Sequence, residues 1–202
     1  MFGHGKNIGI FILLLGSLTF PSAQAGDSTI NTDISTSASH IDFAAPDEGA
    51  RWRIINDTVM GGRSTASAYV EQGRLHFFGQ LSLQNNGGFA SIRRFEAQPL
   101  WSNEQPLQIK VKGDGRRYQF RLRSSLAFDG IAYVTEFTTQ NNVEQIFSFP
   151  LDAFEPRWRG RIVSNAPPLS FTDVNQLGFM LADKQPGAFA LVVYGVKQTS
   201  PN

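Results

Sequence analysis

The chain has 202 residues, a length that fits one domain or at most two small ones. Its 18 Lys and Arg nearly balance its 17 Asp and Glu, which argues against nucleic acid or an anionic membrane as the main partner, because both require a surplus of positive charge. The chain contains no cysteine and only three histidines, which excludes metal sites built from clusters of Cys or His.

The first predicted element is a leader at residues 1–25. It has a basic start with Lys6, a compact apolar run at Ile8–Phe20 and small residues up to Ala25, which is the three-part form of a secretory signal peptide. The apolar run is shorter than the roughly 20 residues that span a bilayer. We therefore predict cleavage after Ala25 and a periplasmic or secreted protein, whose net charge without Lys6 would be near zero.

The rest of the chain divides into three predicted parts. Residues 26–40 are small and polar and would bury too little apolar surface to fold alone, so we predict a flexible lead-in. Residues 41–197 show neither an internal repeat nor a domain boundary and are predicted to form one domain. Residues 198–202 would be a short tail.

Short stretches of alternating apolar and polar residues fill the predicted domain. Alternation is strictest in residues 107–112 and 117–123, and a period of two is typical of strands with one buried face. Gly113–Gly115 lies between these stretches and predicts a tight hairpin turn. The run 187–196 is apolar on both faces and predicts a central strand. We expect no helix beyond a single turn near Leu151–Phe154.

Other stretches repeat the same alternation. The apolar positions that share a parity are Leu75, Phe77, Leu81 and Leu83, then Ile131, Tyr133 and Phe137, then Leu177, Phe179 and Leu181. In all we predict nine or ten strands and an all-β antiparallel β-sandwich or barrel. The connection Glu155–Ser170 shows no alternation and is predicted to be a long loop, and such loops often bind a partner.

The sequence offers little support for catalysis. A serine hydrolase needs a G-x-S-x-G turn and a histidine base, but the turn is absent and only His40 and His76 follow the leader. A glycosidase needs two facing carboxylates, and no spacing pairs two of them here. A calcium site formed by Asp57, Asp114 and Asp183 stays open. We predict a protein without catalytic residues, cofactor or bound metal.

Two stretches are candidates for binding. Residues 157–161, with the sequence RWRGR, interleave cations with Trp158, and Arg and Trp dominate interface hot spots and stack on ligand rings. A solvated loop is the alternative interpretation. Arg93 shares a predicted strand face with Phe89, which is unusual unless the cation is paired or faces a groove. Asp57 or Asp114 is its predicted partner. The candidate binding residues are Arg93, Arg157, Trp158 and Arg159.

Five sequence blocks carry a family resemblance. WRIINDTVMGGRS, GGFASIR, KGDGRRYQFRL, LDAFEPRWRGR and LGFMLADKQPGAFALVV occur in this order. Over about residues 41–197, the order resembles the complex I intermediate-associated protein 30 family. The matching positions, to which the resemblance assigns a structural role, are Trp52, Asn56, Asp57, Met60, Gly61, Gly62, Ser64, Gly87, Gly88, Phe89, Gly113, Asp114, Gly115, Asp183, Gly187 and Phe189.

The resemblance implies a fold and a function. The fold would be a jelly roll similar to galactose-binding domains, and no catalytic residues are implied. Mitochondrial members act as assembly chaperones for membrane-arm intermediates of the respiratory NADH dehydrogenase. We therefore expect a protein-binding assembly factor or chaperone that acts on an envelope or membrane complex.

A carbohydrate-binding module is the alternative, because this fold often presents sugar sites. Exposed aromatic residues beside polar side chains would favour sugar, and Trp101, Tyr133 and Trp158 are the ones to inspect. An apolar patch of a few hundred Å² rimmed by arginines would favour a protein partner.

The motif INDTVMGGRS is predicted to be a packed turn. Its glycines suit backbone positions with positive φ or close approach, and Asn56 and Asp57 suit a turn whose side chains bond the local backbone. We expect this turn to pack against Gly87–Phe89 and to be held by an ion pair between Asp57 and Arg93.

Overall fold

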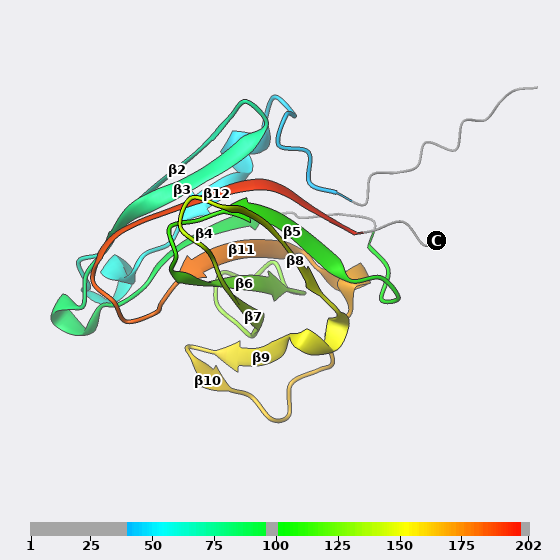
Figure 1. Cartoon of the computed structure of the whole chain (residues 1–202). Coiled ribbons are helices and arrows are strands. Elements are labelled where there is room, and N and C mark those ends of the chain that lie inside the picture. Colours follow the sequence, from blue (N-terminus) through cyan, green and yellow to red (C-terminus); the bar gives the residue numbers. More distant parts are fainter. Residues whose placement is uncertain (1–39, 96–100, 199–202) are drawn as a thin grey trace, which may run out of the picture. The chain divides into compact units, whose positions relative to one another are not determined.

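The computed structural model describes residues 40–95 and 101–198 (Figure 1). These residues form β-strands and short 3₁₀ turns, and they include no helix long and apolar enough to cross a membrane. The predicted signal peptide and most of the predicted lead-in and tail lie outside the described residues. At the start of the described part, His40 forms a β-bridge with Lys197.

The strands form two antiparallel sheets, as predicted. The seven-stranded sheet has the order β1 (Trp52–Ile54), β4 (Ala90–Phe95), β11 (Gln176–Leu181), β6 (Arg117–Arg123), β7 (Ala132–Thr138), β9 (Glu155–Trp158) and β10 (Arg161–Ile162). The five-stranded sheet has the order β2 (Thr65–Glu71), β3 (Arg74–Leu81), β12 (Gly187–Gln198), β5 (Leu107–Lys112) and β8 (Glu144–Phe149). In Figure 1 the strands β2, β3 and β12 lie above β11, β6 and β7.

The described residues include five 3₁₀ turns, one before β1 and four between strands. Their bounds are η1 (Glu48–Arg51), η2 (Asp57–Met60), η3 (Gln84–Asn86), η4 (Leu151–Ala153) and η5 (Phe171–Asp173). The single helical turn predicted near Leu151–Phe154 is η4.

The core lies between the sheets and follows the predicted alternation. Every second residue of β5 and β6 is fully buried: Leu107, Ile109 and Val111, then Tyr118, Phe120 and Leu122. Phenylalanine rings join the two layers, since Phe120 on β6 and Phe149 on β8 have ring centroids 6.0 Å apart. Burial of these rings and of the aliphatic side chains around them stabilises the sandwich.

The predicted central strand is confirmed. β12 pairs with β3 on one side and β5 on the other, so both of its edges are satisfied within the sheet. The alternation in β3 also holds up to Leu81, but the strand ends there. Leu83 lies beyond it and is exposed, because it has entered the turn that leads into η3.

The hairpin predicted at Gly113–Gly115 is wrong. β5 belongs to the five-stranded sheet and β6 to the seven-stranded sheet, so this turn crosses from one layer to the other. Both neighbours of β5 are already occupied, by β12 and β8. Gly113 is required for close approach, because a Cβ there would lie 2.4 Å from Oγ1 of Thr139.

The connection predicted as one long loop contains a short hairpin. Arg161 and Ile162 of β10 pair with Trp158 and Arg157 of β9, and Arg159 and Gly160 form the turn with positive φ. These strands raise the number within the described residues to twelve, above the predicted nine or ten. Sequence alternation missed them because both strands are short and their residues stay partly or fully exposed.

Candidate binding site

The INDTVMGGRS motif is built around one buried carboxylate. Asp57 is 1% exposed. Its Oδ1 accepts a hydrogen bond from the backbone N–H of Ser64 at 2.9 Å, and its Oδ2 accepts one from the Ser64 hydroxyl. Oδ2 also accepts the backbone N–H groups of Gly88 at 2.7 Å and Phe89 at 3.3 Å. The prediction that this turn packs against Gly87–Phe89 is therefore confirmed.

Two glycines of the motifs make room for that carboxylate. A Cβ on Gly62 would lie 2.4 Å from Cγ of Asp57, and one on Gly87 would lie 2.6 Å from its Oδ2. Burial raises the pKa of Asp57, but the hydrogen bonds from Ser64, Gly88 and Phe89 outweigh it and place the pKa below its usual range. Asp57 is thus a charged structural anchor.

The predicted partner of Arg93 is wrong. The Asp57 carboxylate is occupied by the groups just described, and Asp114 accepts hydrogen bonds from elsewhere. Arg93 instead donates from Nη1 to the backbone carbonyl of Phe128 at 2.7 Å and to Oε1 of Gln176 at 3.3 Å. Its guanidinium also lies over the rings of Phe95 and Phe128.

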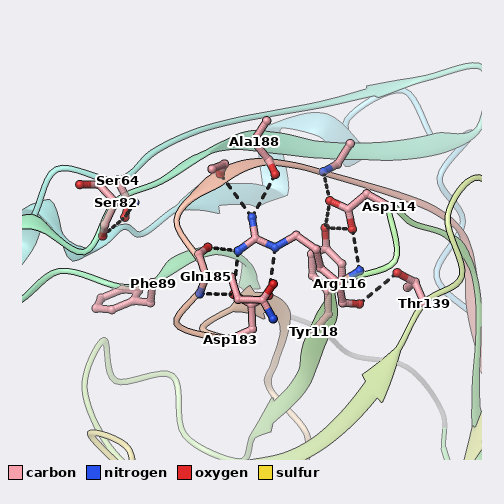
Figure 2. A network of polar contacts seen from close by, with 12 residues as sticks. Ser64, Ser82, Phe89, Asp114, Arg116, Tyr118, Thr139, Asp183, Gln185 and Ala188 are labelled. Carbon is pink, nitrogen blue, oxygen red and sulfur yellow. Dashed lines mark hydrogen bonds and ion pairs between the residues drawn. The ribbon is translucent and has the colours of Figure 1, made fainter.

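The Gly-Asp-Gly and Asp-Lys blocks meet at Arg116 (Figure 2). Arg116 forms an ion pair with Asp183 at 2.7 Å and also donates to the backbone carbonyls of Gly187, Ala188 and Gln185. In Figure 2 its guanidinium lies between the Asp183 carboxylate and the Ala188 carbonyl. The Asp183 side chain is 2% exposed. This contact fixes the β11–β12 connection to the start of β6.

Asp114 belongs to the same network. Its carboxylate accepts the Tyr118 hydroxyl at 3.1 Å and the backbone N–H of Ala190 at 2.8 Å. Burial, followed by the charge of Asp114, raises the pKa of Tyr118 well above its usual range. The described residues contain no group of three His, Cys, Asp or Glu that could hold a metal ion. Asp57, Asp114 and Asp183 therefore serve as structural acceptors and do not form a calcium site.

A pocket opens on the outward face of the seven-stranded sheet. Its lining residues are Ser91, Ile92 and Arg93 of β4, Arg121 and Arg123 of β6, and Gln176, Leu177 and Gly178 of β11. Arg93 is one of the predicted binding residues. Arg121 and Arg123 were not singled out, although the alternation in 117–123 already placed both on the polar face of their strand. Nothing local in the sequence indicated that Gln176 would join them.

The loop between β6 and β7 links this pocket to the other predicted residues. Arg93 bonds the carbonyl of Phe128, and the next residue, Asp129, forms an ion pair with Arg159 at 2.8 Å. Hydrogen bonding by Arg159 is the main reason that the pKa of Asp129 lies below its usual range. Arg93 and Arg159 thus contact two consecutive residues of the β6–β7 loop.

The remaining predicted residues lie beside them. Arg157 pairs with Glu155 at 2.7 Å and approaches Glu136 at 3.6 Å. Trp158 is 45% exposed, and the guanidinium of Arg159 lies 4.8 Å from the centre of its ring. Trp101 and Tyr133, the other aromatic residues considered for sugar stacking, are 4% and 3% exposed. Neither offers a ring face to a ligand.

The fold defines a jelly-roll β-sandwich of the kind found in carbohydrate-binding modules. A family 11 module from Clostridium thermocellum, solved with a β-1,3-1,4-mixed-linked tetrasaccharide, aligns with a TM-score of 0.57 and 14% identity. The alignment covers 81% of this chain and 97% of that chain. An agarase aligns with a TM-score of 0.51 and 11% identity over 81% of this chain and 25% of its own. At such identities these likenesses establish the fold alone.

The sequence then identifies the family. The profile of complex I intermediate-associated protein 30 matches residues 41–193, and the chain belongs to this family. A mitochondrial complex I intermediate-associated protein 30 from Drosophila melanogaster is 28% identical over 75% of this chain, and one from Mus musculus is 25% identical over 75%. An uncharacterized Schizosaccharomyces pombe protein is 26% identical over 75% of this chain.

The fraction of each relative's length that matches this chain differs among these relatives. The match covers 78% of the S. pombe protein but only 59% of the Drosophila protein and 52% of the mouse protein. The prediction of a periplasmic or secreted location is contradicted by the comparison. The Drosophila, mouse and Caenorhabditis elegans relatives are all named as mitochondrial proteins.

Proposed function

We propose that this chain is a non-catalytic protein-binding domain that takes part in the assembly of respiratory complex I. Membership in the complex I intermediate-associated protein 30 family supports this role. The observation that carries the proposal is an exposed apolar surface beside the arginines. It consists of Leu126, Phe128 and Trp158, and is called the loop patch below.

The residues of the loop patch are well exposed for their type. Leu126 is 59% exposed, Phe128 60% and Trp158 45%. Leu126 and Phe128 come from the β6–β7 loop, and Trp158 comes from the β9–β10 hairpin. Isolated exposed apolar residues need no explanation, but several on neighbouring loops mark an interaction surface when polar groups surround them.

The arginines give the loop patch a suitable rim. The ion pair between Asp129 and Arg159 joins the two loops, so the patch is partly ordered before a partner arrives and less entropy is lost on binding. We assign Trp158 as an apolar anchor, and Arg93, Arg157 and Arg159 as the cationic rim. Aromatic residues and arginine are enriched in the hot spots of protein interfaces.

The carbohydrate alternative has less support. Sugar stacking would need exposed aromatic rings, whereas Trp101 and Tyr133 belong to the hydrophobic core. Trp158 is exposed, but Arg159 lies over its ring. The likeness to carbohydrate-binding modules concerns the fold and supplies no sugar-binding residues.

Native electrophoresis of solubilised membranes from cells that express the tagged full chain tests the proposal. We expect the wild-type chain to co-migrate with subunits of complex I in a subcomplex smaller than the mature enzyme. The double variant Phe128→Ser/Trp158→Ala should lose this co-migration and keep its melting temperature, because both side chains are exposed.

Ile146→Ser provides the matched control. Ile146 is 63% exposed and lies on β8 of the other sheet, so its substitution should leave co-migration intact. Absence of complex I subunits from the wild-type band would refute the assembly role. Equal loss with Ile146→Ser would refute the assignment of the loop patch.

A further inference from the structure

In the pocket on the seven-stranded sheet, β4 and β6 carry arginines, and β11, which lies between them, carries a glycine. Gly178 of β11 is the register partner of both Arg93 of β4 and Arg121 of β6. Gln176 of the same strand is the partner of Arg123. Because Gly178 has no side chain, the sheet is hollowed between the arginines. A Cβ at Gly178 would lie 2.2 Å from the carbonyl oxygen of Ile92, so only glycine fits there.

The three arginines of the pocket contact neutral acceptors. Arg93 donates to Phe128 O and Gln176 Oε1, as described above. Arg121 donates from Nη1 to Oε1 of Gln119 at 2.7 Å and to the sulfur of Met180 at 3.3 Å, and Arg123 donates from Nη1 to the carbonyl of Gly130. A guanidinium carries five N–H donors, and each of these three arginines donates from Nη1 alone in these contacts.

The contrast with other arginines of the chain is clear. Arg94, Arg116, Arg157 and Arg159 each form an ion pair at 2.7 or 2.8 Å. Within the described residues, Arg93, Arg121 and Arg123 have no carboxylate within ion-pair distance. Three cations thus share one partly buried pocket without a bonded counter-charge.

Burial and mutual repulsion act on these groups together. Burial, then the charge of Arg123, lowers the pKa of Arg93 to about 10, and the charge of Asp129 acts in the opposite direction on the pKa of Arg93 and of Arg123. Burial, then the charges of Arg123, Arg93 and Arg157, lowers the pKa of Arg121 to about 10 as well. All three remain cationic at neutral pH, and an anion between them would offset both the repulsion and the lost hydration.

We propose that this pocket binds a phosphate group, with Arg93, Arg121 and Arg123 contacting its oxygens above Gly178. A phosphate carries up to two negative charges and enough oxygens for three guanidiniums, whereas a single carboxylate has two oxygens and one charge. Planar guanidinium groups match phosphate oxygens with paired hydrogen bonds. The same chemistry is offered by soluble phosphate and by the phosphomonoester head group of phosphatidic acid.

Gln176 is a positioning residue of this site. It is fully buried, and its Oε1 accepts from Arg93. Its Nε2 donates to the carbonyls of Ser125 and Ala127 in the β6–β7 loop. Gln176 therefore fixes the direction of Arg93 relative to the pocket and does not itself need to contact the ligand.

Calorimetric titration of the full chain with inorganic phosphate at constant ionic strength tests the site. We expect saturable binding, and a loss of affinity of about tenfold or more in Arg121→Gln, since hydrogen bonds to charged groups are the strong ones. Arg74→Gln is the control, because Arg74 is exposed on β3 of the other sheet. Acetate, titrated in the same way, should bind more weakly than phosphate.

A second arm identifies the source of the phosphate. Vesicles of phosphatidylcholine with phosphatidic acid are compared with phosphatidylcholine alone. Co-sedimentation that needs phosphatidic acid and is lost in Arg121→Gln would support a head group, whereas phosphate binding without co-sedimentation would support a soluble ligand. The proposal would be overturned if phosphate did not bind saturably or if acetate bound with the same affinity as phosphate. It would also be overturned if Arg74→Gln lost as much phosphate affinity as Arg121→Gln.

Melting temperature keeps the test independent of folding defects. Phosphate should raise the melting temperature of the wild-type chain by mass action and should leave that of Arg121→Gln unchanged. Removing one of three repelling cations is not expected to unfold the chain. The inference does not depend on the assembly role, because the phosphate measurement uses no protein partner and Arg121, which is substituted in the test, belongs neither to the loop patch nor to its rim.

Discussion

Arg116 and Asp183 form a two-point ion pair in which Nε lies 2.9 Å from Oδ2 and Nη2 lies 2.7 Å from Oδ1. Only 11% of the arginine side chain and 2% of the aspartate side chain are exposed. Two sequence blocks nearly seventy residues apart are thereby fixed to one another. The hydrogen bond to Arg116, acting against burial, places the pKa of Asp183 below its usual range.

Asp183→Asn should lower the free energy of unfolding by about 3 kcal/mol, because it leaves the buried Arg116 without its counter-charge. Urea unfolding at neutral pH measures the change. Glu144→Gln is the matched control, since it breaks the Lys110–Glu144 pair of 2.9 Å whose side chains are 48% and 47% exposed. That variant should unfold with an unchanged midpoint, as exposed pairs contribute little. If Asp183→Asn and Glu144→Gln lost the same free energy of unfolding, burial would not determine how much an ion pair contributes to stability.

Gly62→Ala should destabilise the chain by about 3 kcal/mol, because the added methyl group overpacks a filled site. Its Cβ would lie 2.4 Å from Cγ of the buried Asp57. Thermal unfolding gives the measurement. Gly195→Ala is the control, since no heavy atom lies within 4 Å of its added Cβ, and its effect should stay within about 0.5 kcal/mol. If Gly62→Ala were equally well tolerated, the role given to Asp57 as the centre of the turn would be wrong.

The stabilisation by Asp57 should depend on pH. The folded state lowers its pKa below the ordinary value of 3.8, so its contribution is fully present above that value and is lost as the pH falls through the folded pKa. The difference in unfolding free energy between wild type and Asp57→Asn should therefore be constant near neutral pH and shrink below 3.8. Urea midpoints of the two proteins, measured across this pH range, test the direction of this change. If the stability difference between them grew on acidification, the assigned direction of the pKa shift would be wrong.

The sandwich was predictable because its signals are local. Residues 107–112 and 117–123 alternate strictly, and each places one face in the core. The pairing of those strands was not predictable. Alternation shows which face of a strand is buried, but it does not show which other strand lies beside it. For that reason the sequence predicts a hairpin at Gly113–Gly115, although the chain crosses between the sheets there.

The site was less predictable than the fold. Arg93 stood out because a cation shared a face with Phe89, but its contacts with Phe128 and Gln176 depend on residues 35 and 83 positions away. Glu48 gave no local signal at all. The predicted compartment failed for another reason. The prediction rested on the pattern of residues 1–25 alone, whereas the family profile that relates the chain to mitochondrial proteins matches residues 41–193.

Glu48 supports a buried network at the other edge of the sheet. It is 2% exposed, and its oxygens contact Nε of Arg94 at 2.7 Å and Nη2 of Arg94 at 2.9 Å. The same carboxylate accepts Nε1–H of Trp52 at 2.9 Å. Trp52 in turn stacks on Phe179 of the core, with ring centroids 6.3 Å apart. The network therefore anchors η1 to the seven-stranded sheet through both charge and packing.

Glu48→Leu should lower the free energy of unfolding by about 3 kcal/mol, because it breaks a buried ion pair by removing one of its members. The double variant Glu48→Leu/Arg94→Met should recover part of this loss, since it replaces both members of the ion pair and keeps apolar volume. Urea unfolding compares the variants, and the near-ultraviolet circular dichroism of Trp52 reports its packing. If the double variant were as unstable as the sum of the two single variants, the hydrogen bond to Trp52 and local packing, rather than the ion pair, would account for the effect of Glu48.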